Sequence, residues 1–184
     1  GQAPTTATGG LIGRPGKFGK AAQLAQATTN LILNPLCKSS GGWWLGFYGG
    51  GSGSLSYESD PGCLGGSRMR ASFTDNGPNT QLRVSYNPIN IQSSLTYTLS
   101  FRVRGSHAYQ TTWVVSRFSA PYTRYWYQSF DVTTEWAEHT YTFTMPAGVV
   151  DAGALFRIEA TGSGWFDVDW AQLEQSAYRT PVAD

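Results

Sequence analysis

The sequence is poor in charge: only 14% of its 184 residues are Asp, Glu, Lys or Arg, and the formal net charge is +1. So small a positive excess argues against a binder of the nucleic-acid backbone, because such proteins gather Lys and Arg strongly. No apolar run approaches the roughly 20 residues that span a bilayer, so we expect no membrane partner. Residues 1–10 (GQAPTTATGG) lack the basic start and apolar stretch of a signal peptide. A signal removed earlier, or an origin within a longer chain, stays open.

Residues for catalysis and metal binding are also scarce. The two histidines, His107 and His139, lie in no nucleophile or metal motif, and the P-loop, Gly-x-Ser-x-Gly and His-Glu-x-x-His patterns are missing. Cys37 and Cys63 are too few for a zinc site. They either form one disulfide or remain two small buried hydrophobic residues, and we favour free thiols because no signal peptide is visible.

Carboxylates in pairs could serve a glycoside hydrolase. Glu135 and Glu138 form one such pair, and Asp167 and Asp169 form another, on one face of an expected strand. Few other acids lie near either pair, so the sequence favours a protein that is not an enzyme.

Aromatic residues, in contrast, are abundant, with seven Trp, ten Tyr and nine Phe, and they argue against disorder. No sustained 3.6-residue pattern is present, so we expect almost no helix. Short alternating segments separated by turn residues are typical of an all-β jelly-roll β-sandwich of about ten short antiparallel strands. We expect residues 1–29 to form an N-terminal arm or linker and residues 30–184 to form the domain. The expected strands are 31–33, 41–48, 55–58, 68–73, 81–86, 95–104, 111–118, 124–132, 139–145, 154–160 and 164–173.

Alternation along these strands selects candidate binding residues. In the clearest strand, Tyr97, Leu99, Phe101 and Val103 share the core side, which places Arg102 and Arg104 on the other side. In the next two strands we expect Trp126 and Phe130 inward, and these four residues outward: Trp113, Arg117, Tyr125 and Tyr127. Exposed rings bind the C–H faces of sugars, and Arg bonds hydroxyls or carboxylates. The alternative is that the outward rings pack under loops or against another subunit.

The sequence resembles the carbohydrate-binding modules of families 4, 9 and 22, which are galactose-binding-like jelly rolls. The resemblance covers about residues 28–181 and rests on the order and spacing of several segments. These are 30–35 (NLILNP), 42–43 (GW), 66–70 (GSRMR), 95–101 (LTYTLSF), Trp136 with 141–144 (YTFT), and 166–174 (FDVDWAQLE). The lead-in 16–21 (GKFGKA) and the tail 177–181 (AYRTP) resemble the version found in bacteriophage tail and virion-associated proteins.

The resemblance implies non-catalytic binding of a polysaccharide or cell-surface glycan in a groove of rings and polar side chains. It also implies a structural calcium ion, for which Asp169 matches the closing-strand aspartate. Lys38, however, occupies a stretch in which the family normally has an acid, and a lysine would repel a cation. An ion pair between Lys38 and Asp169 is therefore the alternative to calcium.

Three readings of function remain. The first is a glycan-binding jelly roll, extracellular or virion-associated, attached to a glycan-active enzyme or part of a phage tail or capsid. The second is a purely structural virion domain, whose rings are buried at contacts in a homo-oligomer or larger assembly. The third, ranked below both, is a glycoside hydrolase or lyase.

Overall fold

The computed structural model describes residues 30–74, 81–117, 121 and 123–182, and within them the chain forms strands and no α-helix. No described helix therefore has the length and apolar character of a membrane span. The strands are β1 (Trp43–Tyr48), β2 (Ser52–Ser59), β3 (Ser67–Thr74), β4 (Gln81–Gln92), β5 (Thr96–Gly105), β6 (Tyr109–Ser116), β7 (Arg124–Val132), β8 (Ala137–Thr144), β9 (Val150–Ala160) and β10 (Gly164–Glu174). The expected all-β jelly-roll sandwich is confirmed. The expected arm, residues 1–29, lies outside the described residues, so that boundary stays a prediction.

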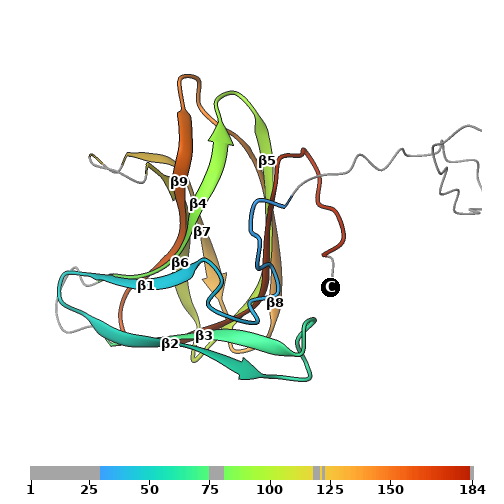
Figure 1. Cartoon of the computed structure of the whole chain (residues 1–184). Coiled ribbons are helices and arrows are strands. Elements are labelled where there is room, and N and C mark those ends of the chain that lie inside the picture. The colour runs from blue at the N-terminus through green and yellow to red at the C-terminus, as the bar shows by residue number, and fades with distance from the viewer. Residues whose placement is uncertain (1–29, 75–80, 118–120, 122, 183–184) are drawn as a thin grey trace, which may run out of the picture.

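The strands form two five-stranded sheets. The first sheet has the order β1-β4-β9-β6-β7, and the second has the order β2-β3-β10-β5-β8. Every pairing between these strands is antiparallel. Figure 1 shows β4 and β9 of the first sheet facing β5 and β8 of the second. Each sheet therefore has one face toward the partner sheet and one outer face.

Alternating apolar residues of the two sheets fill the space between them. On β5, the expected core side is confirmed, because Tyr97, Leu99, Phe101 and Val103 are all buried. The Phe101 ring contacts Trp113 of β6 and Phe130 of β7, with ring centroids 5.1 and 4.7 Å apart. Such edge-to-face contacts join the two sheets directly.

The expected strand at residues 31–33 is wrong. Asn30, just before this segment, makes one isolated bridge with Glu174, and the Leu31 N–H donates to the Leu173 carbonyl. Side chains accept the other two N–H groups of the segment. The Asn30 Oδ1 atom accepts hydrogen bonds from the backbone N–H groups of Ile32 and Leu173, and the Tyr86 hydroxyl accepts one from Leu33. Because side chains replace the ladder partners, the segment crosses beside β10 without becoming a strand.

The expected end of a strand at Asn87-Pro88 is also wrong, since β4 continues to Gln92. The register of β4 against β9 shifts between Tyr86 and Ile89 and again between Ile89 and Ile91. Proline has no N–H to donate to a ladder, and an irregularity of this kind accommodates it within a strand. β2 likewise begins at Ser52, three residues before the expected strand at 55–58.

Candidate functional site

The outer face of the first sheet carries a row of side chains that runs across all five strands. Each member of the row is paired in register with the next one on the neighbouring strand. In the strand order β1, β4, β9, β6 and β7, the members are Trp44, Ser85, Arg157, Val114 and Tyr127. Because neighbouring strands lie roughly 4.8 Å apart, the row extends over about 19 Å from β1 to β7.

An aromatic ring stands at each end of this row, which we call the Trp44–Tyr127 row. Trp44 is 41% exposed and Tyr127 is 64% exposed, whereas the three residues between them are buried. Single exposed rings are common on protein surfaces, but two exposed rings at the ends of one row give a ligand two surfaces on which to stack. The row thus offers two flat surfaces separated by a buried floor, in which Ser85 and Arg157 are polar and Val114 is apolar.

The floor is held by one carboxylate and three guanidinium groups. The Glu159 carboxylate lies 2.6 Å from Arg157, 2.6 Å from Arg124 and 3.5 Å from Arg83. Arg157 also donates to the Ser116 hydroxyl at 2.5 Å. Burial lowers the pKa of Arg157, and the bond to Glu159 opposes that shift. The short ion pair with Glu159 therefore keeps the buried Arg157 side chain in its charged form.

The expected outward position of Trp113 is wrong. Its side chain is fully buried between the sheets, against Phe101 and Phe130. Both Val114 and Val115 are buried as well, so the two faces of β6 are equally apolar and alternation cannot tell which one is inward. Trp113 is therefore a core residue and takes no part in an exposed site.

The neighbouring strand agrees better with expectation. Tyr127 is exposed on the outer face, while Phe130 is buried and Trp126 stacks on Phe143 of β8 with centroids 3.8 Å apart. Tyr125 is half-buried and packs against the core. Arg117 is exposed one residue beyond the end of β6, where its N–H donates to the Thr123 carbonyl.

Arg102 and Arg104 do lie on the outer side of β5, but β5 belongs to the second sheet. The expectation that they share one groove with Tyr127 is therefore wrong, because the sandwich separates the two outer faces. Both guanidinium groups lie over the Trp136 ring, 4.9 and 4.5 Å from its centroid. They belong to a network of charges that covers the middle of the second sheet.

Asp167 is the centre of that network. It is fully buried, and Arg70 binds it through two nitrogens at 2.7 and 2.9 Å. Arg104 and Arg68 approach the same carboxylate at 3.0 and 3.2 Å. Because the Asp167 carboxylate is fully buried and bound by three guanidinium groups, it is not available to a substrate. The pair Asp167/Asp169 therefore does not resemble the catalytic carboxylates of a glycoside hydrolase.

Asp169 has its own partners nearby. Arg102 donates to one carboxylate oxygen at 2.7 Å, and the Leu64 N–H donates to the other at 2.9 Å. The ion pair expected with Lys38 is thus formed with Arg102 instead. Calcium takes six to eight oxygen ligands. A single carboxylate already bound by a guanidinium and an amide does not fit that ion, and the described residues contain no group of three or more His, Cys, Asp or Glu suited to a metal.

The two cysteines lie close to this carboxylate. Both are free and buried, as expected from the sequence. Burial and the Asp169 charge raise the pKa of Cys37 well above its usual value and that of Cys63 to about 12. At neutral pH both remain thiols, which are weak nucleophiles.

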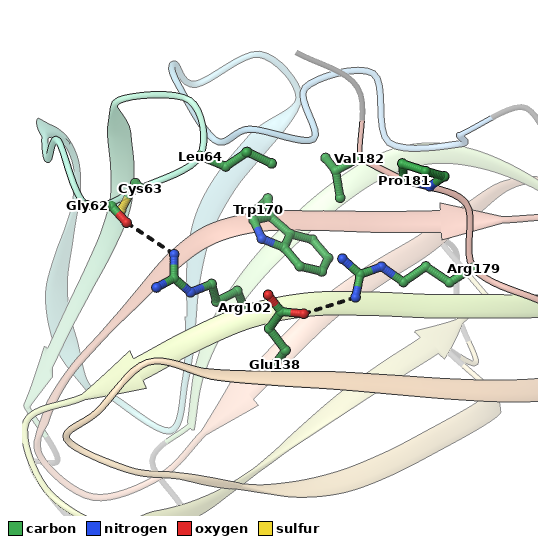
Figure 2. A pocket seen from close by; sticks show the side chains of 9 residues that line it. All are labelled: Gly62, Cys63, Leu64, Arg102, Glu138, Trp170, Arg179, Pro181 and Val182. Carbon is green, nitrogen blue, oxygen red and sulfur yellow. Dashed lines mark hydrogen bonds and ion pairs between the residues drawn. The ribbon is translucent and has the colours of Figure 1, made fainter. Parts of the chain in front are cut away.

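A hollow of about 460 Å³ lies beside Asp169 on the second sheet. Figure 2 shows Trp170 at its centre, Arg102 pointing to the Gly62 carbonyl, and Arg179 paired with Glu138. The Trp170 ring is only 2% exposed, and Arg179 lies over it at 4.5 Å. Because its ring is covered and its charges are paired, this hollow lacks a free surface on which a sugar could stack.

The site residues that sequence reasoning missed all belong to the first sheet. Alternation could not decide which of Trp43 and Trp44 faces outward, since the strand contains large rings at both. Charged residues inside an expected strand were the available signal for the others. These are Arg83, Arg124, Arg157 and Glu159.

Comparison with known proteins adds independent findings. A sequence model of the family CBM_4_9, described as "Carbohydrate binding domain", matches residues 37–164. No curated protein matches the sequence.

Solved structures share the fold. A CBM4 module has a TM-score of 0.59 and 18% identity, over 79% of this chain and 97% of that one. A family 11 module from Clostridium thermocellum, in complex with a β-1,3-1,4-mixed-linked tetrasaccharide, has a TM-score of 0.58 and 16% identity, over 80% and 96%. Tailspike protein 4 of bacteriophage CBA120 has a TM-score of 0.60 and 13% identity, over 78% of this chain but 21% of that one.

Proposed function

Because this chain belongs to the CBM_4_9 family of carbohydrate binding domains, we propose that it binds a polysaccharide, without catalysis, on the outer face of its first sheet. The observation that carries this proposal is the Trp44–Tyr127 row, with an exposed ring at each end and polar groups between. Stacked rings supply apolar contact to the C–H faces of sugars, and the guanidinium groups supply donors to ring substituents.

The second sheet offers a weaker surface for this role. Its central strand, β10, is buried on both faces from Phe166 to Glu174. The Arg and Asp side chains over it are bound to one another, and the Trp136 and Trp165 rings are covered by guanidinium groups. A ligand there would have to displace existing ion pairs, which is costly when one carboxylate is fully buried.

The proposal also concerns where the domain acts. We place it outside the cell, as a module of a larger protein such as a glycan-active enzyme or a phage tail component. The likeness to a tailspike protein concerns the fold alone. A purely structural domain in a virion is the competing function, and it requires partner subunits that cover Trp44 and Tyr127.

Affinity electrophoresis in gels containing soluble polysaccharides tests the proposal. The wild-type chain should be retarded by at least one polymer, and Trp44→Ala and Tyr127→Ala should each reduce the retardation by about tenfold or more in affinity, since stacked rings contribute on the order of 1–2 kcal/mol. Tyr178→Ala is the matched control, because that ring is 42% exposed in the C-terminal tail, away from the row. A stable oligomer that binds no polymer in a broad glycan array would refute the binding function and favour the structural one.

A further inference from the structure

The charges of the Trp44–Tyr127 row are unbalanced. Among the side chains that the structure describes around it, Arg83, Arg124 and Arg157 share the single carboxylate of Glu159. The other acid whose side chain is described on this side of the sheet, Asp131, is exposed and lies opposite Gln110, four residues beyond Tyr127 along β7. The side chains described in the immediate surroundings of the row therefore carry three positive charges and one negative charge.

The excess positive charge is accessible. The Arg124 side chain is 48% exposed and the Arg83 side chain is 31% exposed, whereas Arg157 and Glu159 are almost completely buried. Arg124 uses its NH2 nitrogen to bind Glu159. A planar guanidinium has five N–H donors, so this bond leaves donors in a fork that matches a carboxylate or sulfate.

One hydroxyl group in the row points to the same conclusion. The Ser85 Oγ atom is fully buried between Trp44 and Arg157, and no hydrogen-bond partner for it exists among the described residues. A buried polar atom without a partner is destabilising, and a ligand or an ordered water can complete its bonding. An acceptor oxygen near the middle of the row would satisfy both this hydroxyl and the surrounding guanidinium donors.

We infer that the polysaccharide bound on the Trp44–Tyr127 row is an acidic one, whose carboxylate or sulfate groups pair with Arg124 while its sugar rings contact Trp44 and Tyr127. This inference rests on the proposed function and specifies its ligand class. An acidic chain places a counter-charge beside the exposed Arg124 guanidinium, whereas a neutral chain does not.

The test compares acidic polymers with neutral versions of the same backbone. Polygalacturonate, glucuronoxylan, alginate and hyaluronan are each paired with their carboxyl-reduced derivatives, and dextran sulfate is paired with dextran. The wild-type chain should bind at least one acidic polymer about tenfold or more tightly than its neutral partner, and added salt should weaken that binding. Preference for carboxylated polymers or for dextran sulfate identifies which anionic group is recognised.

Two variants locate the effect. Arg124→Gln should lose the preference for the acidic polymer, while Arg124→Lys, which keeps the charge but not the fork, should retain part of it. Arg179→Gln is the matched control, because it removes the same charge from the hollow on the second sheet. Near-ultraviolet circular dichroism of each variant verifies the fold, and if Arg124→Gln fails to fold, Arg124→Met takes its place.

Each other outcome has a distinct meaning. Equal affinity for an acidic polymer and its carboxyl-reduced form, with sensitivity to Trp44→Ala, would overturn this inference and leave the proposed function standing. Binding to none of the polymers would overturn the proposed function itself. A loss of acidic-polymer binding in Arg179→Gln as large as in Arg124→Gln would move the ligand to the second sheet and overturn the inference.

Discussion

At the scale of single residues, the side of the strand on which a ring lies decides what the ring does. Trp43 and Trp44 are adjacent, yet Trp43 packs edge-to-face on Tyr86 in the core while Trp44 is exposed on the outer face. Trp113 and Tyr127 differ in the same way on the neighbouring strands β6 and β7. A tryptophan on the core side contributes to stability, and a ring on the outer side is available to a ligand.

Truncation of Trp113 should therefore lower the free energy of unfolding much more than truncation of Trp44 does. We expect Trp113→Ala to lower the free energy of unfolding by about 3–5 kcal/mol, because it leaves a cavity beside Phe101 and Phe130. Trp44→Ala should change it by about 1 kcal/mol or less. Urea unfolding of the two variants measures the difference, and equal stabilities would contradict the assignment of Trp113 to the core.

The environment of His139 predicts that the free energy of unfolding depends on pH. It stacks on Phe101 with centroids 5.1 Å apart, and burial lowers its pKa below the usual value of 6.5. The unfolded chain thus binds a proton at a higher pH than the folded chain does. Stability is present above the unfolded pKa and is lost as pH falls through the folded pKa.

We expect the free energy of unfolding to decrease between about pH 7 and pH 5, and His139→Phe, which keeps the stacked ring, to flatten that part of the curve. Denaturant unfolding at a series of pH values measures the effect. A variant curve with the same slope as the wild type would show that His139 is not the responsible group.

At the scale of elements, one irregularity in β10 organises the second sheet. The register of β10 against β5 shifts between Val168 and Trp170, which inserts Asp169 as an extra residue. Asp167, Asp169 and Trp170 are thereby all brought over the outer face, where Arg102 and the 60–66 loop meet them. Bulges commonly redirect side chains in this way.

We propose that Arg102, rather than calcium, balances the buried Asp169 carboxylate. The thermal midpoint of the wild-type chain should then be unchanged by EDTA or by added calcium. Arg102→Met should lower the free energy of unfolding by about 1–3 kcal/mol, because it leaves Asp169 with the Leu64 amide alone. Differential scanning calorimetry measures both effects, and a midpoint that rises by several degrees with calcium would refute the proposal.

At the scale of the whole molecule, the sandwich separates two tasks. The second sheet covers its outer face with an ion-pair network and with the C-terminal tail, whose Thr180 N–H donates to Glu174 at 2.9 Å. The first sheet leaves a ring exposed at each edge. A ligand on the first sheet would lie across the strands, because the two rings belong to β1 and β7 at opposite edges.

This geometry predicts a dependence on ligand length. Affinity for oligosaccharides of the recognised polymer should rise with chain length until the ligand extends over the roughly 19 Å between the two rings, and then level off. Isothermal titration calorimetry with a length series measures this. If a disaccharide bound as tightly as the longest member of the series, the ligand would contact one end of the row only.

The sequence by itself determined the fold class, most strand positions and the core side of β5, because alternation and turn residues are local properties. It also placed Tyr127 and Phe130 correctly on β7. The tertiary structure alone decided which strands share a sheet, and hence that Arg102 and Tyr127 lie on opposite outer faces. It also decided the side of Trp113 and Trp44, since both faces of their strands carry large apolar residues. The partners of Asp169 and Glu159 come from strands and loops far apart in the chain, and no local pattern specifies such contacts.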